Sequence, residues 1–206
     1  MKRRTDLAFR THDVEGRSGR SFKIVVTGPF SAGKTTLIKS VSDLAVVGTE
    51  RGVTDHTSAV KQHTTVAMDF GRITFADDFS LYIFGTPGQR RFEVVWEVLS
   101  EGMLGFVLLV KGAEPGGLEE AGHILEAFER YADVPFVVGV THLDRREEPA
   151  EVILPRIRAA LGLTDEIPVL ACDPRLKEDG KALLLNVLFG VQRRLERVDE
   201  RTRRGA

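Results

Sequence analysis

The chain is predicted to adopt a three-layer α/β fold, with helices on both faces of a mostly parallel sheet that has one antiparallel edge strand. Apolar, strand-like segments alternate with segments of helical periodicity along most of the 206 residues. The runs at 105–110 (GFVLLV) and 135–140 (PFVVGV) are almost continuously apolar, which is typical of strands covered on both faces. The strand-like runs 65–75 and 81–85 are joined at Asp77-Asp78, and this short connection indicates an antiparallel hairpin.

The N-terminal third of the chain contains one strand and one helix between two polar segments. Residues 1–20 are polar and lack periodicity, so we expect a flexible N-terminal arm. Residues 21–28 (SFKIVVTG) are predicted to form a buried strand, and residues 34–41 are predicted to begin a helix. The segment 48–64 is long, polar and interrupted by glycine, and structureless stretches of this length usually carry function.

The remaining elements continue the alternation. Helices are expected at 91–101, 118–131, 149–161 and 180–197, and a short strand is expected at 167–172. The length suits one domain. We therefore expect a single domain over residues 21–197, followed by a charged C-terminal tail at 198–206.

Composition limits the class of protein. The net charge of −1, with 42% hydrophobic and 29% charged residues, is that of an ordinary globular protein and gives no sign of a nucleic-acid partner. No apolar run approaches the roughly 20 residues of a membrane span. The start MKRRTDLAFR lacks the apolar stretch of a signal peptide, and Cys172 is the only cysteine. We expect a cytoplasmic protein without a transmembrane segment.

The segment GPFSAGKT (28–35) matches the phosphate-binding pattern G-x-x-x-x-G-K-[ST]. Its glycines allow backbone N–H groups to turn towards phosphate oxygens, and the helix behind it favours anions at its N-terminus. Lys34 is predicted to reach the β- and γ-phosphates, and the Thr35 hydroxyl is predicted to bind Mg²⁺. The other predicted contacts in this motif are Gly28, Ser31, Ala32, Gly33 and Thr36. A chance match is the alternative, and the strand before and helix after the motif argue against it.

The segment FGTPGQ (84–89) follows the predicted hairpin. Together with the phosphate-binding motif, it gives the chain a resemblance to Ras-like small GTPases, and more narrowly to the bacterial MglA-like group encoded beside roadblock-type regulators. FGTPGQ is similar to the family's second switch, D-x-x-G-Q. The resemblance implies a Ras-like G domain that binds GTP or GDP with Mg²⁺, and a roadblock-family regulator as partner. It also implies that the Gly88 N–H meets the γ-phosphate and that Gln89 orients the attacking water. The alternative is an ordinary Pro-Gly turn.

The aspartate that usually holds Mg²⁺ through water in this switch is replaced by Gly85. If the hairpin turns at Asp77-Asp78, paired positions sum to 155, so Gly85 faces Phe70 and lies beside Asp69. A bulge suggested at Gly71 leaves a register shifted by one residue open. We expect Asp69 to lie near Gly85 and to take over Mg²⁺ binding. The alternative is an aspartate that caps a loop or pairs with an arginine.

Two further segments resemble the guanine-binding boxes of the family. THLD (141–144) ends a predicted strand and is similar to N-K-x-D. The resemblance implies that Asp144 accepts from the N1–H and 2-amino groups of guanine, that His142 covers the base, and that Thr141 replaces an asparagine. VLACDPR (169–175) implies that the backbone N–H of Cys172 or Asp173 meets guanine O6. The alternative for THLD is a strand-end threonine followed by a turn aspartate.

The first switch and the catalytic cation are less clearly marked. Thr64 or Thr65 occupies the position of the family's switch threonine, and the resemblance implies that Thr65 joins the Mg²⁺ shell in the triphosphate state. A Thr-Thr pair entering a strand is also ordinary β-propensity. Arg51, Arg90 and Arg91 are candidates for the charge that stabilises the transferring phosphoryl group, and solvated surface arginines are the simpler interpretation.

Two functions follow from these motifs. The first is a GTP-binding switch with slow intrinsic hydrolysis through Gln89 and Lys34, regulated by a roadblock-type protein. Slow hydrolysis is expected because Phe30 is bulky at the third position of the phosphate-binding motif and because Gly85 lacks a carboxylate. The second is a nucleotide-dependent binding or scaffold module that has lost most hydrolysis. A phosphate-transferring kinase is disfavoured, since the sequence contains no arginine-rich lid insertion or second substrate domain.

Overall fold

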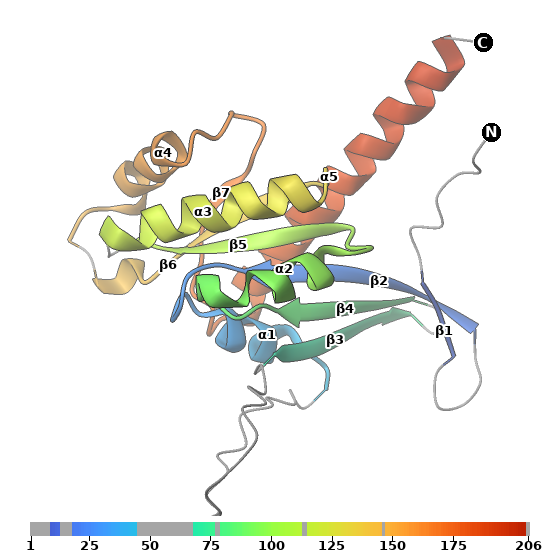
Figure 1. Ribbon diagram of the computed structural model, residues 1–206, viewed down its shortest axis with the longest axis horizontal. Coiled ribbons are helices and arrows are strands. Elements are labelled where there is room, and N and C mark those ends of the chain that lie inside the picture. The colour runs from blue at the N-terminus through green and yellow to red at the C-terminus, as the bar shows by residue number, and fades with distance from the viewer. Residues whose placement is uncertain are drawn as a thin grey trace, which may run out of the picture.

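The computed structural model describes residues 9–12, 18–44, 68–76, 79–112, 115–145 and 147–204 (Figure 1). Its strands are β1 (Phe9–His12), β2 (Ser18–Thr27), β3 (Asp69–Ala76), β4 (Phe79–Gly85), β5 (Gly105–Lys111), β6 (Phe136–Thr141) and β7 (Val169–Ala171). Its helices are α1 (Lys34–Val41), α2 (Glu93–Ser100), α3 (Pro115–Tyr131), α4 (Ala150–Ala160) and α5 (Lys177–Arg204). Two short 3-10 helices, η1 (Arg90–Phe92) and η2 (Leu143–Arg145), follow β4 and β6.

The described strands form one seven-stranded sheet with the order β3-β4-β2-β5-β6-β7, and β1 pairs with the start of β2. The pairs β2–β4, β2–β5, β5–β6 and β6–β7 are parallel, whereas β3 runs antiparallel to β4 at the edge. The predicted α/β fold, with a mostly parallel sheet and an antiparallel edge strand, is confirmed. The carboxyl ends of the parallel strands all lie at the same end of such a sheet, and ligands bind at that end.

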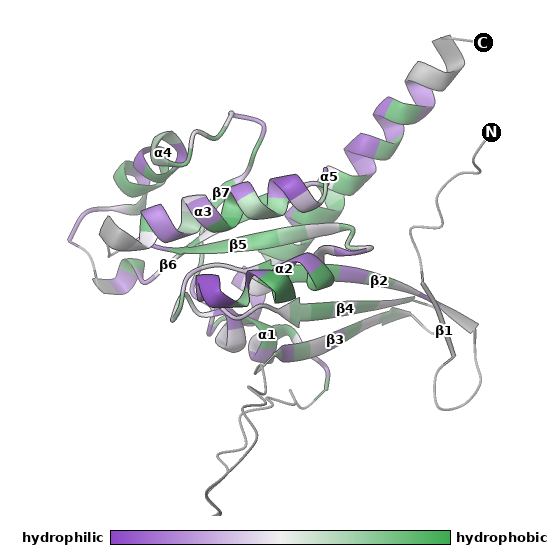
Figure 2. Cartoon of the chain, in the orientation of Figure 1, coloured by the Kyte–Doolittle hydropathy of each residue, from purple (hydrophilic) through white to green (hydrophobic). Residues whose placement is uncertain are grey.

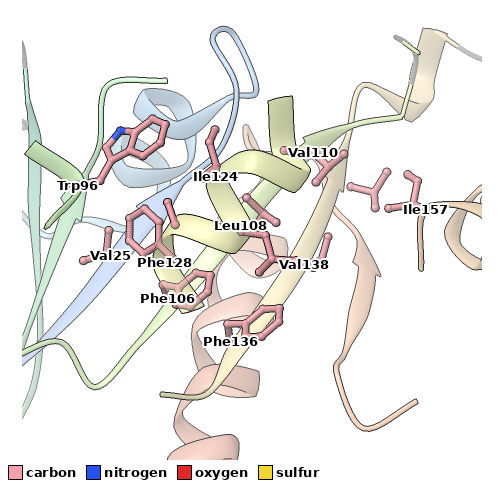
Figure 3. Close-up of a cluster of buried hydrophobic side chains, with 14 of the residues drawn as sticks. Val25, Trp96, Phe106, Leu108, Val110, Ile124, Phe128, Phe136, Val138 and Ile157 are labelled. Carbon is pink, nitrogen blue, oxygen red and sulfur yellow. The ribbon is translucent and has the colours of Figure 1, made fainter. Parts of the chain in front are cut away.

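Buried side chains pack against both faces of the sheet. Val25 belongs to a core with residues of α2, α3 and α4, which Figure 3 shows in close-up. Its neighbours in sequence, Ile24 and Val26, point to the opposite face and join a second core with α1 and α5. All residues of β6 are buried, and β5 is buried up to Lys111. Figure 2 shows the apolar character of β5 between the two helical layers.

The β3–β4 register differs from the predicted one. Asp69 faces Gly85, and the register shifts between Thr74 and Ala76. The expected pairing of Gly85 with Phe70 is therefore wrong by one residue. Next to the turn, Ala76 faces Phe79, as the turn at Asp77-Asp78 predicts. The predicted pairing fails beyond the register shift between Ala76 and Thr74.

The bulge suggested at Gly71 is absent from the described hairpin, because Gly71 lies in the regular part of the ladder opposite Ile83. This position needs glycine for another reason. A Cβ atom there would lie 2.8 Å from Cγ2 of Ile38, so the glycine allows α1 to pack closely against β3.

The described termini contain more regular structure than expected. β1 and the first residues of β2 form an antiparallel pair within the segment expected to be a flexible arm. At the other end, α5 continues through Arg204 and so includes most of the expected tail. The segment 48–64, with Arg51 and Thr64, lies outside the described residues, and so does Thr65. Among the helices described, none is both long enough and apolar enough to cross a membrane.

Candidate functional site

The loop between β2 and α1 has the backbone geometry that its sequence requires. Gly28 and Gly33 have φ values of 138° and 97°, and Ser31 has a φ of 60°. A Cβ atom on Gly28 would lie 2.2 Å from the carbonyl oxygen of Leu109, so no other residue fits at this position. The segment 28–35, hereafter the phosphate loop, thus turns sharply at the carboxyl end of β2 and leads into the N-terminus of α1.

Lys34 is buried at the base of the phosphate loop. Its ammonium donates to the carbonyl oxygens of Gly28 and Pro29, at 2.7 Å each. Burial lowers the pKa of Lys34 to about 8, and the nearby carboxylates of Asp69 and Glu120 oppose this shift. A cation is therefore held inside the loop, where a phosphate group would need it.

Asp69 lies beside Thr35 and Gly85, at the edge of the phosphate loop. The Thr35 hydroxyl donates to Oδ2 of Asp69 at 2.5 Å. A Cβ atom on Gly85 would lie 3.0 Å from the Cβ of Asp69 and 3.3 Å from its Oδ2. A side chain at position 85 would therefore meet both Asp69 and Ile38, whose Cδ1 would lie 2.7 Å from the added Cβ atom.

This pair of oxygen ligands fits the chemistry of Mg²⁺. The ion prefers hard oxygen donors, and sites of this type combine one or two protein groups with phosphate oxygens and water. Within the described part of the chain, no group of three His, Cys, Asp or Glu residues could hold a metal ion. The Thr35 hydroxyl and the Asp69 carboxylate are two oxygen donors that could bind Mg²⁺ together with phosphate oxygens and water.

The turn after β4 lies directly on the phosphate loop. A Cβ atom on Gly88 would lie 2.5 Å from the backbone nitrogen of Phe30, and Gly88 therefore permits the close approach of two backbones. The Trp96 indole N–H donates to the Pro87 carbonyl at 2.7 Å, which ties the turn to α2. Gln89, next to Gly88, is partly exposed just before η1. The turn thus contacts the phosphate loop at Gly88 and is tied to α2 at Pro87.

Thr141, at the end of β6, braces the phosphate loop. Its side chain is fully buried, and its hydroxyl donates to the Ala32 carbonyl at 3.1 Å. The hydroxyl also lies 2.9 Å from Nδ1 of His142, which has a φ of 60°. Asp144 follows in η2 with an exposed carboxylate. The contact of Thr141 with the phosphate loop was missed by sequence reasoning, which considered this residue as a substitute for the base-reading asparagine or as an ordinary strand-end threonine.

The segment after β7 does not present the backbone donors that the sequence suggested. The Cys172 N–H donates to the Val140 carbonyl at 2.9 Å, as part of the sheet. The Asp173 N–H donates to Oδ2 of Asp179 at 2.8 Å. Both N–H groups are engaged within the protein, so the expected contact of either group with guanine O6 is not available in this geometry.

The same segment contributes two residues that sequence reasoning did not assign. Pro174 packs on Gly33, because a Cβ atom on that glycine would lie 2.8 Å from the Pro174 Cγ. Arg175 forms ion pairs with Asp144 and Asp173. One signal in the sequence could have indicated both residues. Pro174 and Arg175 belong to the segment VLACDPR, which resembles a guanine-binding box.

The residues expected to affect hydrolysis lie around the turn. Phe30 is 63% exposed on the phosphate loop, so it does not pack into the core. Arg90 and Arg91 are exposed on η1, and the Arg91 guanidinium lies 4.9 Å from the centroid of the Phe92 ring. Neither arginine is directed by a described hydrogen bond towards the phosphate loop.

A sequence model for a family described as "Conserved hypothetical ATP binding protein" matches residues 26–188. This range contains the phosphate loop, the turn after β4 and both predicted base-reading segments. The chain belongs to this family. It is a P-loop nucleotide-binding protein, with the fold described above.

Similar proteins include one uncharacterised relative and two translation factors. The uncharacterised protein MJ1339 of Methanocaldococcus jannaschii is 31% identical over 122 residues, which are 59% of this chain and 70% of that protein. Translation initiation factor IF-2 of Salinibacter ruber is 28% identical over 150 residues, 72% of this chain and 13% of the factor. Translation initiation factor IF-2 of Mycoplasma mobile is 29% identical over 147 residues, 70% of this chain and 21% of the factor. The chain thus spans only a small part of the two factors.

These matches correct the family expected from the motifs. The predicted membership in the MglA-like group is wrong, because the family that matches residues 26–188 is the one described as ATP-binding. The expected roadblock-family regulator rested on that resemblance alone and is withdrawn with it. The shared phosphate loop explains the error, since the same loop and strand–helix context occur in several families of P-loop proteins.

Proposed function

We propose that this member of the family binds GTP and GDP with Mg²⁺ and acts as a nucleotide-dependent switch with slow intrinsic hydrolysis. The observation that carries the proposal is the meeting of three segments at the carboxyl edge of the sheet. These are the phosphate loop, the Asp69–Gly85 pair and the turn at Gly88. They bring a cation, two oxygen ligands and a backbone turn to one place, as binding of a triphosphate requires.

The phosphate groups would be held mainly by the phosphate loop. We assign their contacts to the backbone of Gly28, Ser31, Ala32 and Gly33, and to Lys34, Thr35 and Thr36. Thr35 and Asp69 are the proposed metal ligands, with Thr65 joining them in the triphosphate state. When bound, Mg²⁺ would neutralise charge on the β- and γ-phosphates. Lys34 would turn from the carbonyls of its own loop towards those phosphates.

The base is proposed to be guanine, although the family description names ATP. The support is Asp144, whose exposed carboxylate lies in η2 after β6. A carboxylate only accepts hydrogen bonds, so it pairs with the N1–H and 2-amino groups of guanine, and adenine offers no equivalent pair of donors. His142 is proposed to cover the base. The Asp173 side chain is proposed to line the base site, whereas the Cys172 side chain is buried in the core.

Hydrolysis is proposed to be slow. Gln89 lies beside Gly88 and is the proposed group for orienting water, and Lys34 would stabilise charge on the transferring group. The Phe30 ring is exposed at the third position of the phosphate loop, and it is proposed to hinder the approach of an activating cation. A hydrolysis-deficient binding module is the second candidate function, and the same exposed ring favours it.

The experiment that tests the proposal is competitive binding of GDP, XDP and ADP to nucleotide-free protein in the presence of Mg²⁺. A clear preference for GDP is expected. Equal binding of ADP, or a preference for it, would overturn the guanine assignment and favour the family's printed description. Single-turnover hydrolysis of GTP then separates the two candidates: slow, Gln89-dependent turnover supports the switch, and no turnover above the Gln89→Ala background supports the binding module.

We also propose how the chain divides. The nucleotide-binding domain is proposed to span residues 21–197, with an N-terminal arm before it, whose β1 pairs with the start of β2, and a charged tail after it, into which α5 continues. The described packing supports this division, because both cores are built from residues between 22 and 188.

A further inference from the structure

Arg175 joins two carboxylates that come from separate parts of the fold. Its Nη2 lies 3.3 Å from Oδ2 of Asp144, in η2 after β6. The same nitrogen lies 2.6 Å from Oδ2 of Asp173, in the segment after β7. The guanidinium is therefore the link between the proposed base-reading carboxylate and the loop that leads into α5.

Arg175 is oriented by its own loop before it meets Asp144. Its Nε donates to both carboxylate oxygens of Asp173, at 2.8 and 3.1 Å, and its backbone N–H donates to Oδ1 of Asp173 at 3.0 Å. The Asp173 N–H is in turn bound by Asp179, in the first turn of α5. Arg175 lowers the pKa of Asp173 to about 2, so Asp173 stays ionised at neutral pH. The fork of the guanidinium is thus fixed largely by neighbours other than Asp144.

The loop that carries Arg175 is also tied to the phosphate loop. Pro174 packs against Gly33, and Thr141 holds the Ala32 carbonyl from the strand that leads to Asp144. The phosphate site and Asp144 are therefore joined by two short routes, one through β6 and one through the Arg175 loop. A displacement of β6 or of the loop that carries Arg175 would therefore move the Asp144 carboxylate relative to a nucleotide whose phosphates are held by the phosphate loop.

The geometry points to Arg175 as a positioning residue that holds the Asp144 carboxylate in place to read a guanine base, an inference that rests on the proposed function. An ionised carboxylate has about four lone-pair sites, so one bond from Arg175 leaves acceptors free for the two donors of guanine. Without the guanidinium, Asp144 and Asp173 would repel each other as like charges. Arg175 both neutralises this repulsion and fixes one oxygen of Asp144.

A role in folding does not account for this arrangement. The side chains of Arg175 and Asp144 are 66% and 58% exposed, and exposed ion pairs contribute little to stability. Removal of Arg175 should therefore change the choice of base and leave the folded state unaffected. This difference separates a positioning residue from a merely structural one.

The test uses the full chain with Arg175→Gln and Arg175→Lys, and with Arg194→Gln as the matched control. Arg194 also pairs with an aspartate, Asp133. That pair lies just before the start of β6, at the end of the strands opposite to the phosphate loop. Binding of GDP and ADP is measured for each protein with Mg²⁺, together with the melting temperature. We expect Arg175→Gln to weaken GDP binding about tenfold, as for the loss of a charged hydrogen-bond network. ADP binding and the melting temperature should be unchanged.

Arg175→Lys should restore part of the GDP preference, because it keeps the charge and loses the fork. Arg194→Gln should behave as the natural chain. Equal weakening of GDP and ADP, or a tighter GDP complex in Arg175→Gln, would overturn the positioning role. A natural chain with no preference for GDP would overturn the proposed function and this inference together, whereas a GDP preference that is undiminished in Arg175→Gln would overturn the inference alone.

Discussion

Asp69 and Gly85 face each other across β3 and β4, and a Cβ atom on Gly85 would lie 3.3 Å from Oδ2 of Asp69. The contact of Asp69 with the Thr35 hydroxyl puts that carboxylate next to the phosphate loop. Asp69 thus brings a carboxylate on β3 close to both Gly85 of β4 and the phosphate loop. Its proposed use is to bind Mg²⁺ from β3, which leads to a direct test.

Asp69→Asn is expected to weaken Mg²⁺-dependent nucleotide binding by about 10- to 100-fold, because the amide keeps the shape of the side chain and loses its charge. The measurement is the nucleotide Kd with Mg²⁺ and with a chelator. Binding with the chelator should not change. Asp43→Asn is the control, since Asp43 also contacts β3, through the Thr74 N–H at 2.8 Å. An equal loss under both conditions would speak against a metal role for Asp69.

Lys34 is proposed to favour nucleotide binding, whereas its burial lowers the stability of the folded, nucleotide-free protein. Its pKa of about 8 lies below the usual 10.5, so burial penalises the charged side chain in the nucleotide-free protein. Between about pH 8 and about pH 10.5 the unfolded chain binds more protons at this site than the folded one, so the contribution of Lys34 to stability rises with pH. Below about pH 8 the full penalty is present.

Lys34→Met is therefore expected to raise the free energy of unfolding of the nucleotide-free protein near pH 7, by between about 1 and about 3 kcal/mol. The lower end of this range allows for the two hydrogen bonds that Lys34 donates to the carbonyls of Gly28 and Pro29. These bonds favour the charged form and so offset part of the cost of burial. Denaturant unfolding of both proteins near pH 7 and near pH 10 checks this prediction. The difference in the free energy of unfolding between the two proteins should narrow as pH rises. A difference that does not depend on pH would contradict the burial of a charged ammonium as its cause.

At the scale of elements, the turn after β4 is where the phosphate loop could sense the state of the nucleotide. It is fixed by Trp96 on α2 and pressed against the loop at Gly88. Movement of this turn would have to move α2 or break the indole hydrogen bond. The only tryptophan of the chain is thus placed to report on the turn.

Gly88→Ala is expected to lift the turn away from the phosphate loop, because the added methyl would lie 2.5 Å from the Phe30 nitrogen and 2.8 Å from the Gly28 carbonyl oxygen. Triphosphate binding and hydrolysis should fall by at least about tenfold, and Trp96 fluorescence should no longer differ between GDP and a GTP analogue. Gly122→Ala is the control, since only Leu161, at 3.9 Å, lies near its added methyl. Unchanged binding in Gly88→Ala would remove this turn from the site.

The elements that the sequence predicted best are those whose burial leaves little choice. β5 and β6 were placed to within about one residue, because runs covered on both faces are apolar throughout. The hairpin was found, but its register was not, because the bulge that shifts it lies near Phe75 and carries no glycine signal. β1 was missed because its few residues pair only with the start of β2 and form no apolar pattern.

The candidate site shows the same division. The phosphate loop could be predicted because steric limits dictate its glycines, and Asp69 could be placed near Gly85 from the hairpin alone. Arg175 and the bracing role of Thr141 could not, since both depend on contacts between segments more than 30 residues apart. The family was misassigned for a related reason: the phosphate loop records a way of binding phosphate, and it does not by itself identify the protein that carries it.

At the scale of the whole molecule, α5 serves two environments along one helix. Its first half packs on the sheet through Leu183, Leu184 and Val187, which are all buried. Its second half extends past the sheet, as Figure 1 shows, and Leu195 and Val198 are exposed there. The glycines at 180 and 190 allow the first half to approach α1 and Pro135 closely.

This division predicts a sharp difference between two leucines of the same helix. Leu183→Ala should lower the free energy of unfolding by about 2 to 5 kcal/mol, because it removes a fully buried side chain from the core shared by α1, α5 and the sheet. Leu195→Ala, at a site that is 48% exposed, should change it by less than about 0.5 kcal/mol. Denaturant unfolding of the two variants checks both values, since the same substitution in the same helix cancels the effect of helix propensity. Comparable losses at the two positions would mean that the outer half of α5 is also covered in the folded protein, and the boundary proposed at residue 197 would then have to move.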